Sequence, residues 1–134
     1  MVSRQQRRSR GFTLIELMIV ISLLLILITV AIPIYSQSIL RAKESVLRQD
    51  LFTLRQVIDQ YTLDKQKAPQ SLDDLVSAGY MRQIPLDPFT NRNDSWTVVQ
   101  EDTTNDPSVT EPGISDVHSG ASGTATDGTA YSSW

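Results

Sequence analysis

A single carboxylate at the start of a long apolar run is the feature that most constrains this chain. Residues 10 to 16 read Arg-Gly-Phe-Thr-Leu-Ile-Glu, and no charged residue follows Glu16 until Arg41. A lone charge costs about 2.5–3.5 kcal/mol at the centre of a membrane helix and less near its end. Such a charge is retained where it has a function, so Glu16 is a candidate functional residue.

The apolar run predicts a membrane-spanning helix over residues 12–35. From Leu17 to Ile34 the only interruptions are Ser22, Thr29 and Pro33. At a rise of about 1.5 Å per residue, about 20 residues are enough to cross a bilayer. A secretory signal peptide that is removed has a shorter apolar core. A permanent anchor therefore explains the length of this run better.

Pro33 lies inside the expected helix. A proline there removes one backbone hydrogen bond and clashes with the preceding turn, at a cost of about 3 kcal/mol. We expect a kink or a locally melted turn at this position. Such a weak point would let the segment stretch or repack, and the alternative is a proline that the membrane helix simply tolerates.

Beyond the membrane, the helix is expected to continue as an amphipathic half over residues 36–66. Apolar residues recur at spacings of 7, 4, 3, 4 and 3, which places them on one helix face. This stripe comprises Leu40, Leu47, Leu51, Leu54, Ile58 and Tyr61, widened by Ile39, Val46 and Val57. Charged residues, Glu44 among them, are assigned to the other side. A helix from about Phe12 to Asp64 would be about 80 Å long, and its second half must lie against a globular head.

Residues 67–134 are expected to form that head, which makes the fold class α+β. Ser71 and the two aspartates after it predict the start of a short helix that ends before Gly79. Segments 96–99 and 114–118 have strand character and predict a small antiparallel sheet, followed by a C-terminal loop. A head of this size is marginal without further support. Because the chain has no cysteine, a bound metal ion or neighbouring subunits would have to supply that support.

Charge is distributed unevenly along the chain. Residues 1–11 carry four arginines and no acid, whereas residues 68–134 carry two arginines and ten acids, so their net charges are +4 and −8. Arginines that flank an apolar segment remain in the cytoplasm, which places the acidic head outside the inner membrane. Nucleic acid is an unlikely partner for such an acidic surface.

The start of the chain resembles the processing signal of the type IV pilin superfamily. The matching stretch is Gly11-Phe12-Thr13-Leu14-Ile15-Glu16-Leu17-Met18-Ile19-Val20. In that family a prepilin peptidase cuts after the glycine and methylates the new amino terminus. The resemblance implies cleavage between Gly11 and Phe12, an N-methylphenylalanine at Phe12, and a discarded basic leader, residues 1–11. It also makes Glu16 the fifth residue of the mature chain and places Pro33 at the family's helix-breaking proline.

Glu16 and Pro33 are therefore candidate assembly residues. When apolar helices of several subunits pack together, the Glu16 carboxylate can meet the positive terminal amine of Phe12 on a neighbour. A paired charge in lipid costs far less than an isolated one, which favours assembly in a fixed stagger. The alternative is that Glu16 only extends to the membrane interface.

The head narrows the resemblance to the major pseudopilin of bacterial type II secretion systems. The matching pattern is Leu72…Leu75-Val76…Gly79-Tyr80-Met81…Ile84-Pro85…Asp87-Pro88-Phe89. Phe89 and Thr90 stand where the family often has Trp and Gly. The absence of cysteine agrees with this resemblance, because adhesive type IV pilins usually close their C-terminal loop with a disulfide.

Major pseudopilins fold the C-terminal end around a calcium ion. Asp116-Val117-His118-Ser119-Gly120 resembles the start of that loop, and Tyr131-Ser132-Ser133-Trp134 takes the place of its closing segment. The resemblance implies Asp116, Ser119 and Asp127 as calcium ligands. Calcium takes about six to eight oxygens, and only two side-chain carboxylates are present after residue 113. Backbone carbonyls near Ser119 and the Ser and Thr hydroxyls could fill part of the shell. An uncoordinated polar loop is the alternative, and His118 is assigned a structural or exposed role.

The resemblance implies a structural subunit of a type II secretion pseudopilus, a homopolymer that drives protein export. Its expected partners are the prepilin peptidase, an inner-membrane platform protein, an assembly ATPase and minor pseudopilins. The expected location is the inner membrane of a Gram-negative bacterium, with one span and the head in the periplasm. The nearest alternative is a type IV pilin or minor pilin for adhesion, motility or DNA uptake. We expect no catalysis, because the sequence shows no nucleophile-base-acid set, phosphate loop or histidine cluster.

Overall fold

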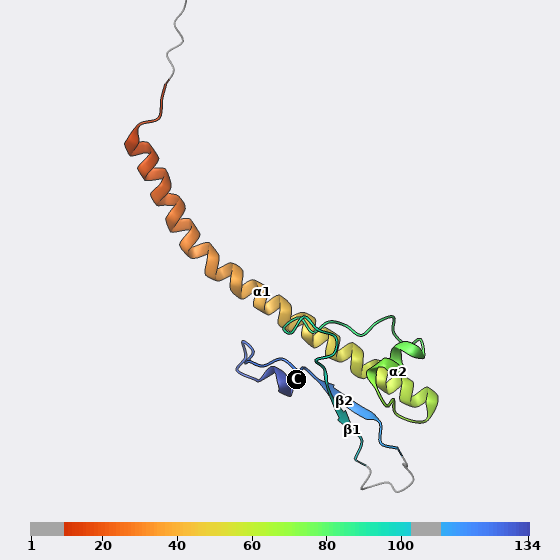
Figure 1. Ribbon diagram of the computed structural model, residues 1–134. Coiled ribbons are helices and arrows are strands. Elements are labelled where there is room, and N and C mark those ends of the chain that lie inside the picture. The colour runs from red at the N-terminus through yellow and green to blue at the C-terminus, as the bar shows by residue number, and fades with distance from the viewer. Residues whose placement is uncertain (1–9, 103–110) are drawn as a thin grey trace, which may run out of the picture. The chain divides into compact units, whose positions relative to one another are not determined.

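The computed structural model describes residues 10–102 and 111–134, and most of the expected leader lies outside these residues. Along the chain follow the helices α1 (Leu14–Lys65) and α2 (Leu72–Ser77), the strands β1 (Thr97–Gln100) and β2 (Ile114–His118), and the short 3-10 helix η2 (Tyr131–Ser133) (Figure 1). A long helix, a short helix and a two-stranded antiparallel sheet confirm the predicted α+β class. Internal contacts divide the chain into two compact units, Met1–Ser38 and Ile39–Trp134.

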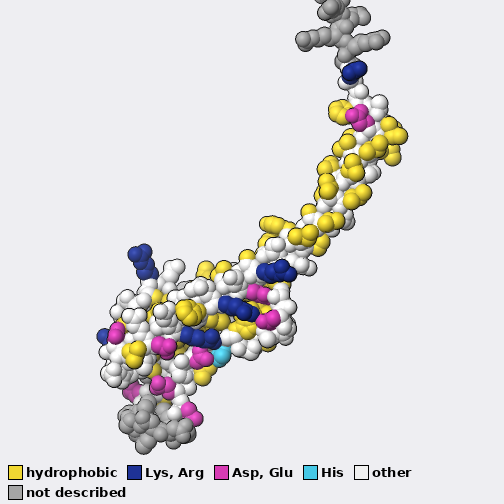
Figure 2. All heavy atoms as spheres, turned by 180° about the vertical axis from the view of Figure 1, so that it is seen from behind, with side chains coloured by type: hydrophobic (Ala, Val, Ile, Leu, Met, Phe, Trp, Pro, Cys, Tyr) yellow, Lys and Arg dark blue, Asp and Glu magenta, His cyan; other side chains and the backbone are white. Residues whose placement is uncertain are grey.

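The first unit consists mainly of the N-terminal part of α1, whose apolar side chains are exposed all round. An 18-residue stretch of the helix has a mean hydropathy of 3.1, and none of that stretch is buried within the protein. Figure 2 shows hydrophobic side chains covering the visible face of this segment. Length and composition therefore suit a membrane span, because such a surface is stable where lipid or other apolar helices surround it.

The hydroxyl groups inside this segment are satisfied by the helix itself. The Ser22 hydroxyl donates to the Met18 carbonyl at 2.7 Å, and the Thr29 hydroxyl donates to the Leu25 carbonyl at 2.7 Å. These bonds remove the need for an outside polar partner within an apolar surrounding. The helix also continues without interruption through Pro33. Of the two forms of weak point expected there, the melted turn is therefore not observed.

The second half of α1 supplies one side of the head's core. Most of the predicted stripe is buried, namely Leu47, Leu51, Leu54, Ile58 and Tyr61. Opposite it lie Leu75 of α2, Trp96, the β2 residues Ile114 and Val117, and Tyr131 of η2. The predicted widening of the stripe is wrong for Ile39 and Val46, which are exposed, whereas Val57 packs against the core. The core is thus narrower than the pattern suggested.

Helix α2 begins and ends as its sequence predicts. Ser71 is the N-cap residue, and the Asp74 carboxylate accepts the backbone N–H groups of Gln70 and Ser71 at 2.8 and 3.0 Å. At the other end Gly79 has a φ of 81°, a left-handed conformation in which glycine is not strained. The Tyr80 N–H then donates to the Leu75 carbonyl, which closes the helix with a Schellman turn.

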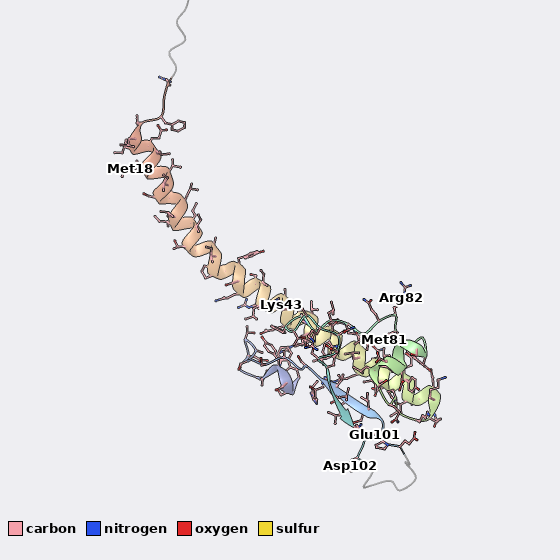
Figure 3. All side chains as sticks on the ribbon, in the orientation of Figure 1. Met18, Lys43, Met81, Arg82, Glu101 and Asp102 are labelled. Atoms are coloured by element: carbon pink, nitrogen blue, oxygen red, sulfur yellow. The ribbon has the colours of Figure 1, made fainter. Side chains whose placement is uncertain are left out.

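The sheet pairs the two predicted strand segments. Thr97 lies opposite His118 and Val98 opposite Val117, and the register shifts between Val99 and Gln100. Pairing continues past the strands, since the Glu101 N–H donates to the Gly113 carbonyl at 2.8 Å. Figure 3 shows Glu101 and Asp102 at this end of β1. β2 leads directly into the C-terminal segment, residues 119–134.

The segment that follows β2 passes very close to the one that precedes β1. A Cβ atom added at Gly120 would lie only 1.8 Å from the Ser95 carbonyl oxygen. Gly120→Ala is therefore expected to force a backbone shift and to lower the free energy of unfolding by about 1–3 kcal/mol. Thermal melting of the full-length protein in detergent, followed by tryptophan fluorescence, measures this loss.

Ser122→Ala is the matched control for this prediction, because Ser122 lies two residues further on and is exposed. It is expected to melt like the unmodified protein. Equal melting temperatures for Gly120→Ala and Ser122→Ala would show that the approach to Ser95 does not constrain the fold.

Candidate functional site

The N-terminal junction is an extended segment that leads into α1. Residues 10–13 precede the helix and are exposed. A Cβ atom added at Gly11 would meet no other atom within 4 Å, so nothing in the described fold requires a glycine here. A requirement for glycine at this position would have to come from an enzyme that recognises the junction.

Thr13 and Glu16 start the helix. The Thr13 hydroxyl accepts the Glu16 backbone N–H at 3.2 Å, and the Thr13 carbonyl accepts the Leu17 N–H at 3.2 Å. Thr-Leu-Ile-Glu has the spacing of a capping box, and the threonine half of that motif is formed. Glu16 thereby lies in the first turn of α1, where the positive end of the helix dipole favours a carboxylate.

The Glu16 carboxylate is exposed at the start of the helix. Within residues 10–102 and 111–134, no side chain or backbone N–H forms a hydrogen bond or ion pair with it. Its neighbours are apolar and exposed: Phe12 is 83% and Ile15 is 68% accessible to solvent. The junction therefore presents one carboxylate beside apolar side chains that are exposed in the described structure.

A second glutamate of α1 has the opposite environment. Glu44 is only 7% exposed, which corrects its assignment to the polar side of the helix. It divides the seven-residue gap between Leu40 and Leu47 into steps of four and three. These are the steps of the apolar stripe, so the same periodicity that predicted the stripe could have indicated that Glu44 faces the head.

Glu44 is held by neutral donors from the C-terminal segment. Its Oε1 atom accepts the Thr126 backbone N–H at 2.8 Å and the Tyr131 hydroxyl at 2.9 Å. Its Oε2 atom accepts the Thr126 hydroxyl at 2.7 Å. The Thr126 hydroxyl contributes most to lowering the pKa of Glu44 below its ordinary 4.5; burial opposes this shift, and the Thr126 N–H and Tyr131 hydroxyl reinforce it. Glu44 is therefore ionised at neutral pH although it is buried.

One helical turn further on, Arg48 contacts the same segment. Its guanidinium lies 2.9 Å from Asp127 Oδ2 and 4.1 Å from the centroid of the Trp134 ring. The Trp134 indole donates in turn to the Thr129 hydroxyl at 2.6 Å. Asp127 Oδ1 accepts both the Thr129 hydroxyl and its backbone N–H, at 2.6 and 2.9 Å. Both carboxylate oxygens of Asp127 are therefore engaged by donors of the protein.

The other expected calcium ligands are engaged as well. Asp116 Oδ1 accepts Arg55 Nε and the Val117 N–H, each at 2.7 Å. Its Oδ2 lies 3.6 Å from His118 Nε2. Burial disfavours the charged form of Asp116, but the Val117 N–H and Arg55 outweigh it and lower its pKa. The Ser119 hydroxyl is buried and donates to Asp87 at 2.6 Å.

The residues present do not suit a calcium ion. Calcium requires several oxygens that converge on one point and are free to coordinate. Among the described residues, no three acidic, histidine or cysteine side chains lie together as possible ligands. Asp116 and Asp127 each face an arginine instead, and Ser119 faces Asp87. The three expected ligands therefore have protein partners in place of a shared cation.

Asp87 is a functional residue of the head whose role the sequence did not reveal. Its side chain is fully buried, and Oδ1 accepts the N–H groups of Phe89 and Thr90 at 2.8 and 3.3 Å. The Phe89 ring stacks on Tyr131 with centroids 4.1 Å apart. The carboxylate thus shapes the Asp-Pro-Phe turn and joins it, through Ser119, to the start of the C-terminal segment. An aspartate before proline signals such a turn, but not its burial.

Together, the exposed apolar helix, the processing motif at its start and the small head define a membrane-anchored protein of the type IV pilin class. A family model described as the prokaryotic N-terminal methylation motif matches residues 6–32. The comparison with solved structures found no match. The match over residues 6–32 confirms the resemblance of this stretch to the pilin signal.

Curated relatives from several bacteria carry the name type II secretion system core protein G. The relative from Aeromonas hydrophila is 33% identical over 103 residues, which cover 65% of this chain and 72% of the relative. The relative from Klebsiella pneumoniae is 34% identical over 62% of this chain and 71% of its own length. The relative from Escherichia coli K12 is 30% identical over 66% of this chain and 72% of its own length. The chain belongs to the family of type II secretion system core protein G, the family of the major pseudopilins.

The state of Glu44 predicts how the head responds to acid. Its pKa is lower in the folded protein than in the unfolded chain, so the unfolded chain binds the proton more tightly. The stabilisation is therefore complete above the ordinary glutamate pKa and is lost as the pH falls through the lowered value. The melting temperature of the full-length protein in detergent is expected to fall between about pH 5 and about pH 3.

Glu44→Gln serves as the comparison, because it cannot titrate. Its melting temperature is expected to be lower at neutral pH and to depend less on acid than that of the unmodified protein. Parallel acid profiles for the two proteins would contradict an ionised Glu44.

Proposed function

We propose that the chain is a structural subunit of a type II secretion pseudopilus. The observation that carries this proposal is the Glu16 carboxylate, which has no described partner and lies four residues after Phe12 in the chain. Cleavage between Gly11 and Phe12 would create a positive amine on Phe12. In an assembly of parallel helices, that amine can pair with Glu16 of a neighbouring copy. The pair would remove the cost of both charges and fix the axial offset between subunits.

Apolar packing supplies the rest of the assembly. The first unit exposes large apolar side chains on all sides, so helices of several copies can pack around one another as they leave the lipid. The head, with its acidic net charge, would then lie on the outside of the filament. The relatives reported above are secretion proteins, which favours a pseudopilus over an adhesive or motile pilus.

Processing and assembly require partners that act on the N-terminal unit. A prepilin peptidase would remove the leader, and a platform protein with an assembly ATPase would move the processed chain out of the membrane. Minor pseudopilins are the expected partners of the growing filament. The four arginines of residues 1–11 favour a cytoplasmic leader. This supports a location of the head in the periplasm of a Gram-negative cell. The chain's own chemistry in this proposal is packing, without a catalytic step.

Glu16→Gln tests the pairing directly, because it removes the charge and keeps the shape. The change would leave the Phe12 amine of a neighbour unpaired in an apolar surrounding, a loss of about 3–5 kcal/mol per contact. The association constant between subunits is expected to fall by more than about a hundredfold. The yield of filaments then falls, while membrane insertion remains. Sheared filaments and the membrane fraction, quantified from the same cells, measure both quantities.

Ser22→Ala is the matched control for Glu16→Gln. Its hydroxyl bonds only within the helix, so the variant is expected to assemble normally. An unchanged filament yield for Glu16→Gln would remove the pairing role, even if the chain were still processed.

Gly11→Ala tests the processing site. Because a Cβ atom at Gly11 meets no atom of the described residues within 4 Å, the fold is expected to remain intact while the peptidase no longer cleaves. The measurement is the mobility of the chain on a gel, with mass spectrometry of its amino terminus. Ser9→Ala, a change within the leader, is expected to be processed normally. Normal cleavage of Gly11→Ala would contradict the assignment of this junction.

A further inference from the structure

The C-terminal segment, residues 119–134, is attached to α1 through a buried carboxylate. Glu44 accepts hydrogen bonds from Thr126 and Tyr131, which lie at two separate points of this segment. A carboxylate that accepts several hydrogen bonds inside a protein orients all of its donors around one centre. One side chain of the helix therefore fixes both the middle of the segment and the start of η2.

Arg48 provides a second attachment with the opposite charge. Glu44 and Arg48 are four residues apart and thus lie on neighbouring turns of one helix face. Arg48 contacts Asp127 and the Trp134 ring, whereas Glu44 contacts Thr126, directly before Asp127, and Tyr131, three residues before Trp134. Anion and cation on α1 therefore meet complementary groups of the same loop.

The three carboxylates of this region that a cation could bind are thereby used within the protein. Asp127 is compensated by Arg48, Asp116 by Arg55, and Glu44 by three neutral donors. No buried side-chain oxygen or nitrogen in the described residues lacks a hydrogen-bond partner. An ion that bound Asp116 or Asp127 would have to compete with an arginine for the carboxylate.

We propose that Glu44 is the ionic centre that holds the C-terminal segment on α1, and that this attachment forms without a divalent cation. Thr126 and Tyr131 act as its donors, and the Arg48–Asp127 pair reinforces it. The head thus obtains from its own helix the support that a bound metal ion or a disulfide would otherwise supply. This attachment concerns the single subunit and does not depend on filament assembly.

The test is the thermal stability of the full-length protein in detergent, with calcium chloride, with magnesium chloride and with excess EDTA. Trp96 and Trp134 report on the core and on the C-terminal segment by fluorescence. The melting temperature is expected to be the same in all three conditions, and calorimetric titration with calcium is expected to show no saturable binding. A melting temperature that falls with EDTA, or that rises with calcium alone, would overturn the proposal.

Variants test the role of Glu44 itself. Glu44→Gln is expected to lower the melting temperature by several degrees, equally with EDTA and with calcium. Tyr131→Phe removes only one donor hydroxyl and keeps the ring, so a smaller fall in the same direction is expected, and it can be measured even if Glu44→Gln does not fold. Asp59→Asn, an exposed position of α1, is the matched control and is expected to change nothing. If Tyr131→Phe and Glu44→Gln both melt like this control, Glu44 is not the centre of the attachment.

Discussion

The central constraint on this protein is the Glu16 carboxylate, which has no hydrogen-bond or ion-pair partner within the described residues. Glu16 begins a helix with no other charged residue until Arg41, and nothing in the described residues compensates its carboxylate. In lipid this arrangement is unfavourable for a single subunit. In the proposed filament a second copy supplies the cation, so the group that is costly in the monomer would make the polymer specific. The proposal thus assigns membrane anchoring and assembly to one segment of one helix.

The two glutamates of α1 differ in how their charge is compensated. Glu16 is exposed and has no partner within the described residues, whereas Glu44 is buried and accepts three hydrogen bonds from its own chain. The exposed Glu16 leaves the N-terminal unit available for association. The hydrogen bonds of Glu44 hold the C-terminal segment on the head, whose small core would otherwise be marginal. Each half of the helix therefore contains one carboxylate with a distinct proposed role: Glu16 in assembly and Glu44 in the stability of the head.

The fold followed from the sequence where periodicity and turn chemistry were strong. The stripe from Leu47 to Tyr61, the α2 helix ended by Gly79 and the two strands all appear where their patterns predicted them. The site was predicted less completely. Gly11, Phe12 and Glu16 carry a local motif, so the sequence could point to them, although their assembly role stays a prediction.

The contacts of the C-terminal segment could not be predicted, because they join residues about eighty positions apart. Glu44 and Thr126 are separated by 82 residues, and Arg48 and Asp127 by 79. A glutamate among polar neighbours gives no sign of a partner at that distance, and Asp116 and Asp127 look alike whether they bind a cation or an arginine. Only the path of the chain around the head decides between these partners. The resemblance implied calcium ligands at Asp116 and Asp127, where the structure places arginine partners, and at Ser119, where it places Asp87.

The pairing of Glu16 with a neighbour's amino terminus is tested most directly by zero-length crosslinking within filaments. Filaments are grown from a mixture of isotope-labelled and unlabelled protein and treated with a membrane-permeant carbodiimide, which joins a carboxylate to an amine in contact with it. Mass spectrometry is expected to find an amide between Glu16 of one copy and the Phe12 nitrogen of another, with both labels in one crosslinked pair. Filaments in which Glu16 joins only its own chain, or joins no amine at all, would contradict the pairing.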